Sequence, residues 1–86
     1  MIGDQFIRST DSVSANIAEG YGRFHYLDRR KFYYNARGSL LETENWLDLL
    51  RERDFINEEQ RNSIKVMIMD LRVKLNNFIA KTTDQV

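Results

Sequence analysis

No proline interrupts this chain, so nothing in its 86 residues forces a helix to break. Apolar residues recur at helical spacing in three long stretches, which cover about residues 4–19, 28–53 and 57–81. The short connection around residues 54–56 forces the last two stretches into an antiparallel hairpin. We therefore predict a single all-α domain over residues 1–86, built as an antiparallel up-and-down bundle of three long helices.

Composition excludes several classes of protein. The chain has no cysteine and one histidine, His25. Disulfide frameworks and thiolate zinc sites are excluded, and so are di-iron bundles, which need a histidine from each of two helices. No apolar run approaches the roughly 18 residues that a membrane helix requires, and no signal segment opens the chain. We expect a cytoplasmic protein with no metal, no cofactor and no membrane contact.

Local signals predict where the helices end and how closely they approach. Asp28 is suited to cap the second helix, and Asn57 is suited to cap the third, with Gln60 completing a capping box. Gly20 is expected to end the first helix. Gly38 lies in the middle of the second stretch, where glycine costs about 1 kcal/mol relative to alanine. It therefore predicts a close crossing with another helix.

The third stretch is apolar on two sides. Its main stripe consists of Ile64, Ile68, Leu71, Leu75 and Phe78. Val66, Met69 and Val73 form a second stripe, roughly opposite the main one. A helix that is apolar on two sides must be buried on two sides, and three helices of this length do not supply enough cover. We assign these three residues, together with Trp46, to an oligomer interface or to the face that receives a further helix.

The charges are balanced overall, 13 basic against 13 acidic, but unevenly distributed. A neutral chain lacks the global field of a nucleic-acid binder, yet its basic front half permits a local patch. In such a patch, cations neutralise phosphates and a ring stacks on an unpaired base. The candidate contact residues are Arg23, His25, Arg29, Arg30, Lys31, Arg37 and Tyr33. Alternatively, the tyrosines pack between helices and the cations pair with nearby carboxylates.

A structural role is expected for the loop after the first helix. Glu19 is expected to pair with Arg23 or Arg37 and so hold the loop that contains Gly20 and Gly22. This loop is too short for a phosphate-binding loop and follows a helix, not a strand.

Two combinations of polar residues are candidates for chemical sites. His25 and the serines of the first helix have no triad spacing. Glu42, Glu44 and Asp48 lie about one turn apart, as metal ligands do, but no second set of ligands stands opposite. We predict no catalytic residue and no metal ligand, and the chain is not expected to be an enzyme.

Two motifs in order carry a resemblance to a known family. Residues 16–26 read NIAEGYGRFHY and residues 32–42 read FYYNARGSLLE. Together they closely resemble the small bacterial four helix bundle protein family. That family includes proteins encoded in intervening sequences of large-subunit rRNA genes, and it is related to the accessory variability protein of diversity-generating retroelements. The resemblance covers about Gln5 to Ile79.

The resemblance implies a helical bundle that forms homo-oligomers, often pentameric rings, with no known catalytic activity. It also implies binding of RNA or DNA and, from the retroelement relative, a reverse transcriptase as protein partner. The family begins with another long helix before the region of Gln5, and this chain starts after it. We therefore predict a non-enzymatic oligomeric module that binds nucleic acid through its basic and aromatic loop. The alternative is a protein-interaction module with no nucleic-acid role.

Overall fold

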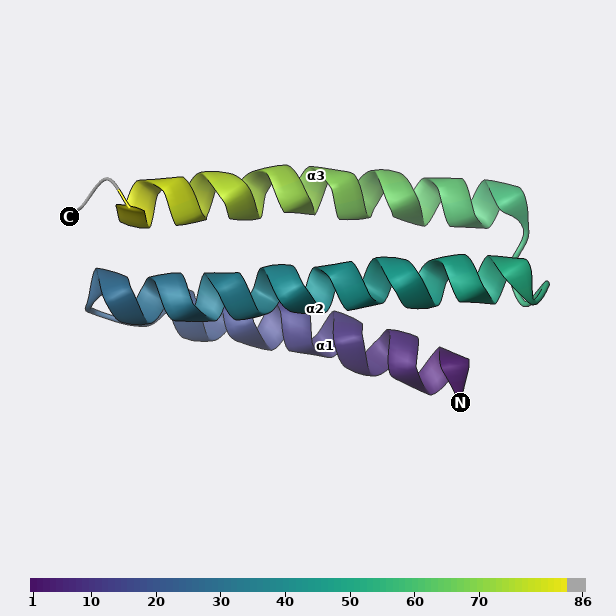
Figure 1. Cartoon of the computed structure of the whole chain (residues 1–86), viewed down its shortest axis with the longest axis horizontal. Helices are drawn as coiled ribbons and strands as arrows, with labels where there is room; N and C mark the ends of the chain where they lie inside the picture. Colours follow the sequence, from purple (N-terminus) through teal and green to yellow (C-terminus); the bar gives the residue numbers. More distant parts are fainter. Residues whose placement is uncertain (84–86) are drawn as a thin grey trace.

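The chain folds into three long antiparallel helices (Figure 1). The computed structural model describes residues 1–83, and within this range it contains α1 (Ile2–Tyr21), α2 (Tyr26–Glu52) and α3 (Glu58–Thr83) and no strand. The molecule is 46 Å long. The predicted all-α fold is confirmed, and each helix begins or ends a few residues beyond the range expected from the spacing of its apolar residues.

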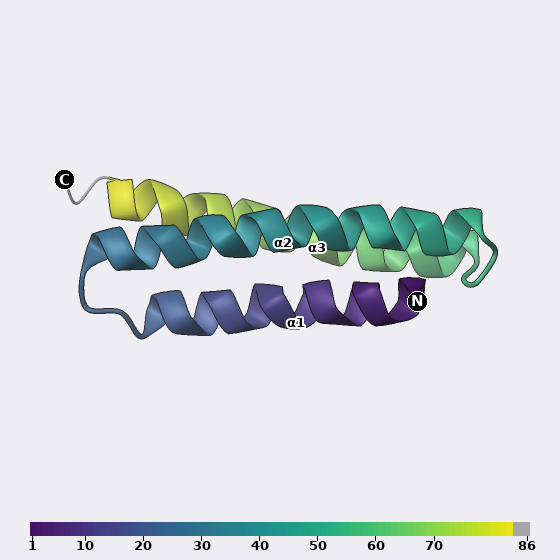
Figure 2. The same ribbon diagram turned by 60° about the horizontal axis from the view of Figure 1, so that its bottom comes forward.

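Helix α2 lies in the centre, with α1 and α3 packed against two of its sides (Figures 1 and 2). In the described part of the chain, no Cα atom of α1 lies within 8 Å of one in α3. The α1–α2 loop and the last turn of α3 share one end of the molecule, and the α2–α3 turn lies at the other. The layout is that of a bundle with one side open.

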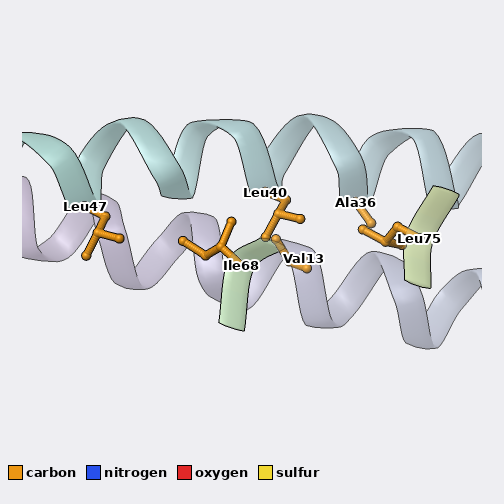
Figure 3. Packing of buried hydrophobic residues seen from close by; sticks show 6 residues of the cluster. All are labelled: Val13, Ala36, Leu40, Leu47, Ile68 and Leu75. Atoms are coloured by element: carbon orange, nitrogen blue, oxygen red, sulfur yellow. The ribbon is translucent and has the colours of Figure 1, made fainter. Parts of the chain in front are cut away.

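The core is a single row of apolar side chains between the helices (Figure 3). Its fully packed members come from all three helices and are Val13, Ala36, Leu40, Leu47, Ile68 and Leu75. All six follow the helical spacing of the sequence. Beyond them, at the end of α3, the main stripe shifts by one residue. Ile79 is buried there, and Phe78, which the pattern predicted to be buried, is partly exposed.

The contact between α1 and α2 is unusually polar. The hydroxyl oxygens of Ser9 and Thr43 lie 2.9 Å apart, and those of Ser12 and Ser39 lie 2.7 Å apart. Hydrogen bonds to neighbouring hydroxyls and carbonyls satisfy these buried groups, and their small size lets the two backbones come close. The serine-rich sequence of α1 is therefore explained by packing.

The helix ends match the sequence signals in one case and differ in another. The amide of Asn57 donates to Oε1 of Gln60 at 2.9 Å, and the amide of Gln60 donates to Oδ1 of Asn57 at 2.8 Å, which confirms the capping box. The predicted cap at Asp28 is wrong, because α2 starts earlier, with His25 in the N-cap position and no capping hydrogen bond from its side chain. Asp28 lies in the first turn instead, where its negative charge complements the helix dipole.

Two glycines have roles different from those predicted. Gly20 does not end α1, which continues to Tyr21 with Gly22 as its C-cap. Gly20 is buried against α2, and a Cβ there would lie 2.7 Å from Cε1 of Tyr33, so a larger residue fits only if the ring or a helix shifts. Gly38, predicted to mark a crossing, has nothing within 4 Å of the position of a Cβ. Packing between the described helices therefore does not require a glycine at position 38.

Candidate functional site

The α1–α2 loop is held by the interaction of Arg23 with α1 and α2. The guanidinium of Arg23 lies 3.1 Å from the carboxylate of Glu19 and 4.9 Å from the centre of the Phe32 ring. Of the two pairings predicted for Glu19, the structure has the one with Arg23. Both partners are substantially exposed, so the pair orients the loop more than it stabilises the fold.

Five cations and one carboxylate, Asp28, occur between residues 23 and 37. Lys31 lies 5.9 Å from the centre of the Phe32 ring, and His25 is exposed at the start of α2. Arg29 and Arg30 are half-buried in the first two turns of α2. The structure therefore gathers most of the predicted cations at the loop end of the bundle.

Tyr33 does not belong to this surface. Its ring is only 6% exposed, lies beneath Gly20 and packs on the ring of Phe78 with 5.5 Å between the centroids. A base cannot stack on a ring that is almost fully buried. Tyr33 therefore has the alternative role predicted for the tyrosines, which is packing between helices.

Two other rings are open to solvent at the same end. Tyr21 is 83% exposed and Phe24 is 94% exposed, and the Phe24 ring stands edge-on to His25 at 5.9 Å. Phe24 was not among the predicted contact residues. Phe24 lies between Gly22 and the start of α2, outside the apolar stripe of either helix. This position is the sequence signal that identifies it.

A hollow of about 450 Å³ lies beside these rings, where the end of α3 meets the loop. It is lined by Tyr21, Arg29, Tyr33, Phe78, Lys81 and Thr82. Lys81 adds a cation from the C-terminal turn of α3, which the sequence did not associate with the loop. The hollow combines positive charge with aromatic walls.

Arg37 lies apart from the loop and links α2 to α3. Its guanidinium donates to Oδ1 of Asn76 at 3.0 Å and stacks over the ring of Tyr34 at 4.8 Å. The position of Arg37 therefore does not support the predicted nucleic-acid contact. Its contacts indicate that it links α2 to α3.

Of the three carboxylates with metal-ligand spacing, Glu44 and Asp48 face cations on α3 instead. Asp48 lies 3.1 Å from both Lys65 and Arg61, and Glu44 lies 3.0 Å from Arg72. Partial burial raises the pKa of Asp48, but the hydrogen bonds from Lys65 and Arg61 outweigh burial, so its pKa lies below the ordinary value. These carboxylates hold the α2–α3 hairpin together.

An apolar groove runs along the open side of the bundle, between α1 and α3. It encloses about 300 Å³, and its floor and walls are apolar or hydroxyl-bearing. The α3 wall is formed by Ile64, Met67, Ile68 and Leu71. The stripe predicted for an oligomer interface or a further helix does not line this groove and is exposed on the outside; it consists of Val66, Met69 and Val73. The two apolar sides of α3 are therefore two separate surfaces.

Trp46 lies on neither of these surfaces. It is half-buried on the α1 side of α2 and lines an apolar hollow of about 870 Å³ with Ile2, Leu50 and Phe55. Trp46 thus packs near the first turn of α1, and the structure does not bring it together with Val66, Met69 and Val73.

Comparisons with known proteins place the fold and the family. None of the helices in residues 1–83 is long and apolar enough to cross a membrane. No curated protein matches the chain. A solved structure from Bacteroides thetaiotaomicron, described as a protein of unknown function from the S23 ribosomal protein family, is 30% identical with a TM-score of 0.88. The match covers 92% of this chain and 73% of that one. The profile of the 23S rRNA-intervening sequence protein family matches residues 1–77, and the chain therefore belongs to this family.

Proposed function

We propose that the chain is a non-enzymatic binding module that holds single-stranded nucleic acid at its loop end. The observation that carries the proposal is the exposure of Tyr21 and Phe24 beside a cluster of cations. Exposed rings without a packing role stack on unpaired bases, while neighbouring arginines and lysines neutralise the phosphates. The family name associates this group of proteins with rRNA genes, which agrees with the proposal.

Binding is tested by fluorescence anisotropy with a labelled single-stranded RNA and a single-stranded DNA of mixed sequence. Stacking on one ring contributes about 1–3 kcal/mol, so Phe24→Ala is expected to weaken binding at least about fivefold. Phe55→Ala is the matched control, because Phe55 is also an exposed phenylalanine but lies in the turn at the other end of the bundle. Equal losses in both variants would contradict a specific role for Phe24.

Salt dependence tests the electrostatic part of the proposal. About three phosphate contacts predict a fall of about 20-fold in affinity between 50 and 200 mM salt. Arg23→Ala is expected to reduce this dependence, and Arg53→Ala, an exposed arginine near the α2–α3 turn, is expected to leave it unchanged. Affinity that does not respond to salt would refute the phosphate contacts.

A second candidate function is favoured by the groove between α1 and α3, and it is the binding of one amphipathic helix. The match covers 92% of this chain and 73% of the Bacteroides protein. That protein therefore has about 30 residues outside the match. A helix that spans the 46 Å bundle at 1.5 Å per residue needs about the same number. Such a helix would complete a four-helix bundle by filling the groove with its apolar face.

The groove is tested with a synthetic peptide of the largest unmatched segment of the Bacteroides protein, titrated by calorimetry. Met67→Glu places a charge in the groove and is expected to abolish binding. Met69→Glu is the matched control, since Met69 is a similarly exposed methionine on the outer side of the same helix. Binding that survives Met67→Glu, or no binding to the unmodified chain, would refute this function.

A further inference from the structure

A hollow lies where the last turn of α3 meets the α1–α2 loop, at one end of the molecule (Figure 1). Its volume of about 450 Å³ is in the range of small-ligand pockets, roughly 300–1,000 Å³. All three helices contribute to its walls, which include Tyr21, Arg29, Tyr33 and Lys81. These residues are far apart in sequence and meet here only because the chain folds. We call this hollow the end pocket.

Although no base can stack on the ring of Tyr33, its hydroxyl opens into the end pocket. Tyr33 is 6% exposed, and the end pocket is the hollow that it lines. The hydroxyl makes no hydrogen bond with a residue in the described part of the chain, yet it is not fully enclosed. The small open part of Tyr33 therefore includes the hydroxyl. Because the large majority of buried hydroxyl groups have a partner, this one is placed to donate to an oxygen atom of a bound molecule.

The charges of the end pocket favour an anion with more than one negative charge. Arg29 and Lys81 line it, and none of the described residues that line it is acidic. Lys81 forms no ion pair within residues 1–83. A terminal phosphate monoester carries about 1.5 to 2 negative charges at neutral pH, whereas a phosphate within a strand carries about one. Two cations therefore match the end of a strand better than its middle.

We propose that the end pocket binds the terminal phosphate of the strand held at the loop end, so that the chain prefers nucleic acid with a phosphorylated end. The inference rests on the proposed function and adds the class of strand to it. Arg29, Lys81 and the hydroxyl of Tyr33 provide donors for the three free oxygen atoms of a terminal phosphate. An internal phosphate has only two free oxygen atoms, and it requires a path for the strand on both sides.

The exposed rings extend the contact from the phosphate to the bases. Tyr21 lines the end pocket and is 83% exposed, so its ring is available to the base of the terminal nucleotide. Phe24 does not line the end pocket and is 94% exposed, which makes it available to a base further along the strand. One end of the strand is thus fixed in the end pocket, and the rest leaves across the loop.

The proposal is tested by fluorescence anisotropy with three short single-stranded RNAs of one sequence, each labelled at an internal nucleotide. One is phosphorylated at its first nucleotide, one at its last nucleotide, and one carries hydroxyl groups at both ends. A phosphorylated strand is expected to bind at least about tenfold more tightly than the hydroxyl-ended strand, because only the phosphate makes charge-assisted hydrogen bonds in the end pocket. The tighter-binding of the two phosphorylated strands identifies the end that enters.

Two variants separate contacts in the end pocket from general attraction to an added charge. Tyr33→Phe removes only the hydroxyl and keeps the packed ring, and it is expected to lower the preference for the phosphorylated strand about threefold. Tyr34→Phe is the matched control, because Tyr34 does not line the end pocket. Lys81→Gln is expected to lower the preference at least about fivefold, and Lys74→Gln, at an exposed lysine of α3 that does not line the end pocket, is expected to leave it unchanged.

The outcomes distinguish this proposal from simpler roles of the same residues. Lys81 lies in the last turn of α3, where a cation also complements the carbonyl end of the helix. If that is its whole role, Lys81→Gln lowers the melting temperature followed by circular dichroism and leaves the preference unchanged, which would overturn the proposal. Equal affinities for all three strands would overturn it and leave the proposed function intact, whereas no binding of any strand would refute both.

Discussion

Replacing Gly20 with alanine tests whether close packing of α1 on α2 explains this glycine. The added Cβ would lie 2.7 Å from Cε1 and 3.0 Å from Cδ1 of Tyr33, and 3.2 Å from Cβ of Phe32. Carbon atoms in contact are normally about 3.5–4.0 Å apart. The Tyr33 ring cannot easily move away, because its other side packs against Phe78. Either α1 shifts outward or the ring leaves its preferred position.

The expected cost combines two opposing terms. Inserting a methyl group into a packed site costs about 1–3 kcal/mol, and alanine recovers at most about 1 kcal/mol of helix propensity, less in the last turn of a helix. The net loss is about 1–2 kcal/mol in the free energy of unfolding. For a domain of this size it lowers the melting temperature by about 4–8 °C per kcal/mol. Urea denaturation followed by far-ultraviolet circular dichroism measures the loss.

Gly38→Ala is the matched control for this prediction. It makes the same chemical change in a helix, but nothing lies within 4 Å of the new methyl group. At concentrations where the chain is monomeric, Gly38→Ala is expected to stabilise the protein by about 0.5–1 kcal/mol. If Gly20→Ala is as stable as wild type while Gly38→Ala is stabilised, the packing argument for Gly20 is wrong.

Three further predictions concern polar contacts. Glu19→Ala breaks an exposed pair with Arg23 and is expected to cost only about 0.3–0.5 kcal/mol, so a loss above 1 kcal/mol in thermal melts would contradict the geometry. Asn57→Ala removes half of the capping box and is expected to cost about 1 kcal/mol, measured by urea denaturation. The pKa of Asp48 is lower in the folded chain than in the unfolded chain. The stability that its ion pairs contribute is therefore present above about pH 4 and is lost as the pH falls through the folded pKa. Asp48→Asn is thus expected to cost about 0.5–1 kcal/mol at neutral pH, and a difference from wild type that persists under strongly acidic conditions would refute the assignment.

Helical spacing was sufficient to predict the elements and most of the core. Ala36, Leu40 and Leu47 recur on one side of α2, and residues with that spacing must face a partner helix. The capping box at Asn57 was equally readable, because both of its members are close in sequence. Local patterns of this kind do not depend on how the helices are arranged.

The candidate site was harder to predict because it depends on distances between helices. Tyr33 and Tyr34 are neighbours in sequence, yet one is buried under Gly20 and the other lies on the outer surface. Only the direction in which each residue faces separates them, and that direction is fixed by where α1 and α3 pack. The same holds for α3, where two apolar sides were visible in the sequence but their assignment to a groove and an outer face was not.

The polar contact between α1 and α2 has a consequence for local stability. Val13 is the only fully buried large apolar residue that α1 contributes to the described core. Phe6 and Ile17 are half-buried, and Phe6 lines the open groove. Helices with few buried apolar contacts open more readily than the rest of a fold. Amide hydrogen exchange is therefore expected to be faster in α1 than in the middle of α2. Filling the groove with the helical peptide covers the open side of Phe6 and should slow exchange in α1 more than elsewhere. Two results would contradict this explanation of the weak hold on α1. One is equal protection of α1 and α2 in the free chain, and the other is a peptide that slows exchange only on the outer side of α2.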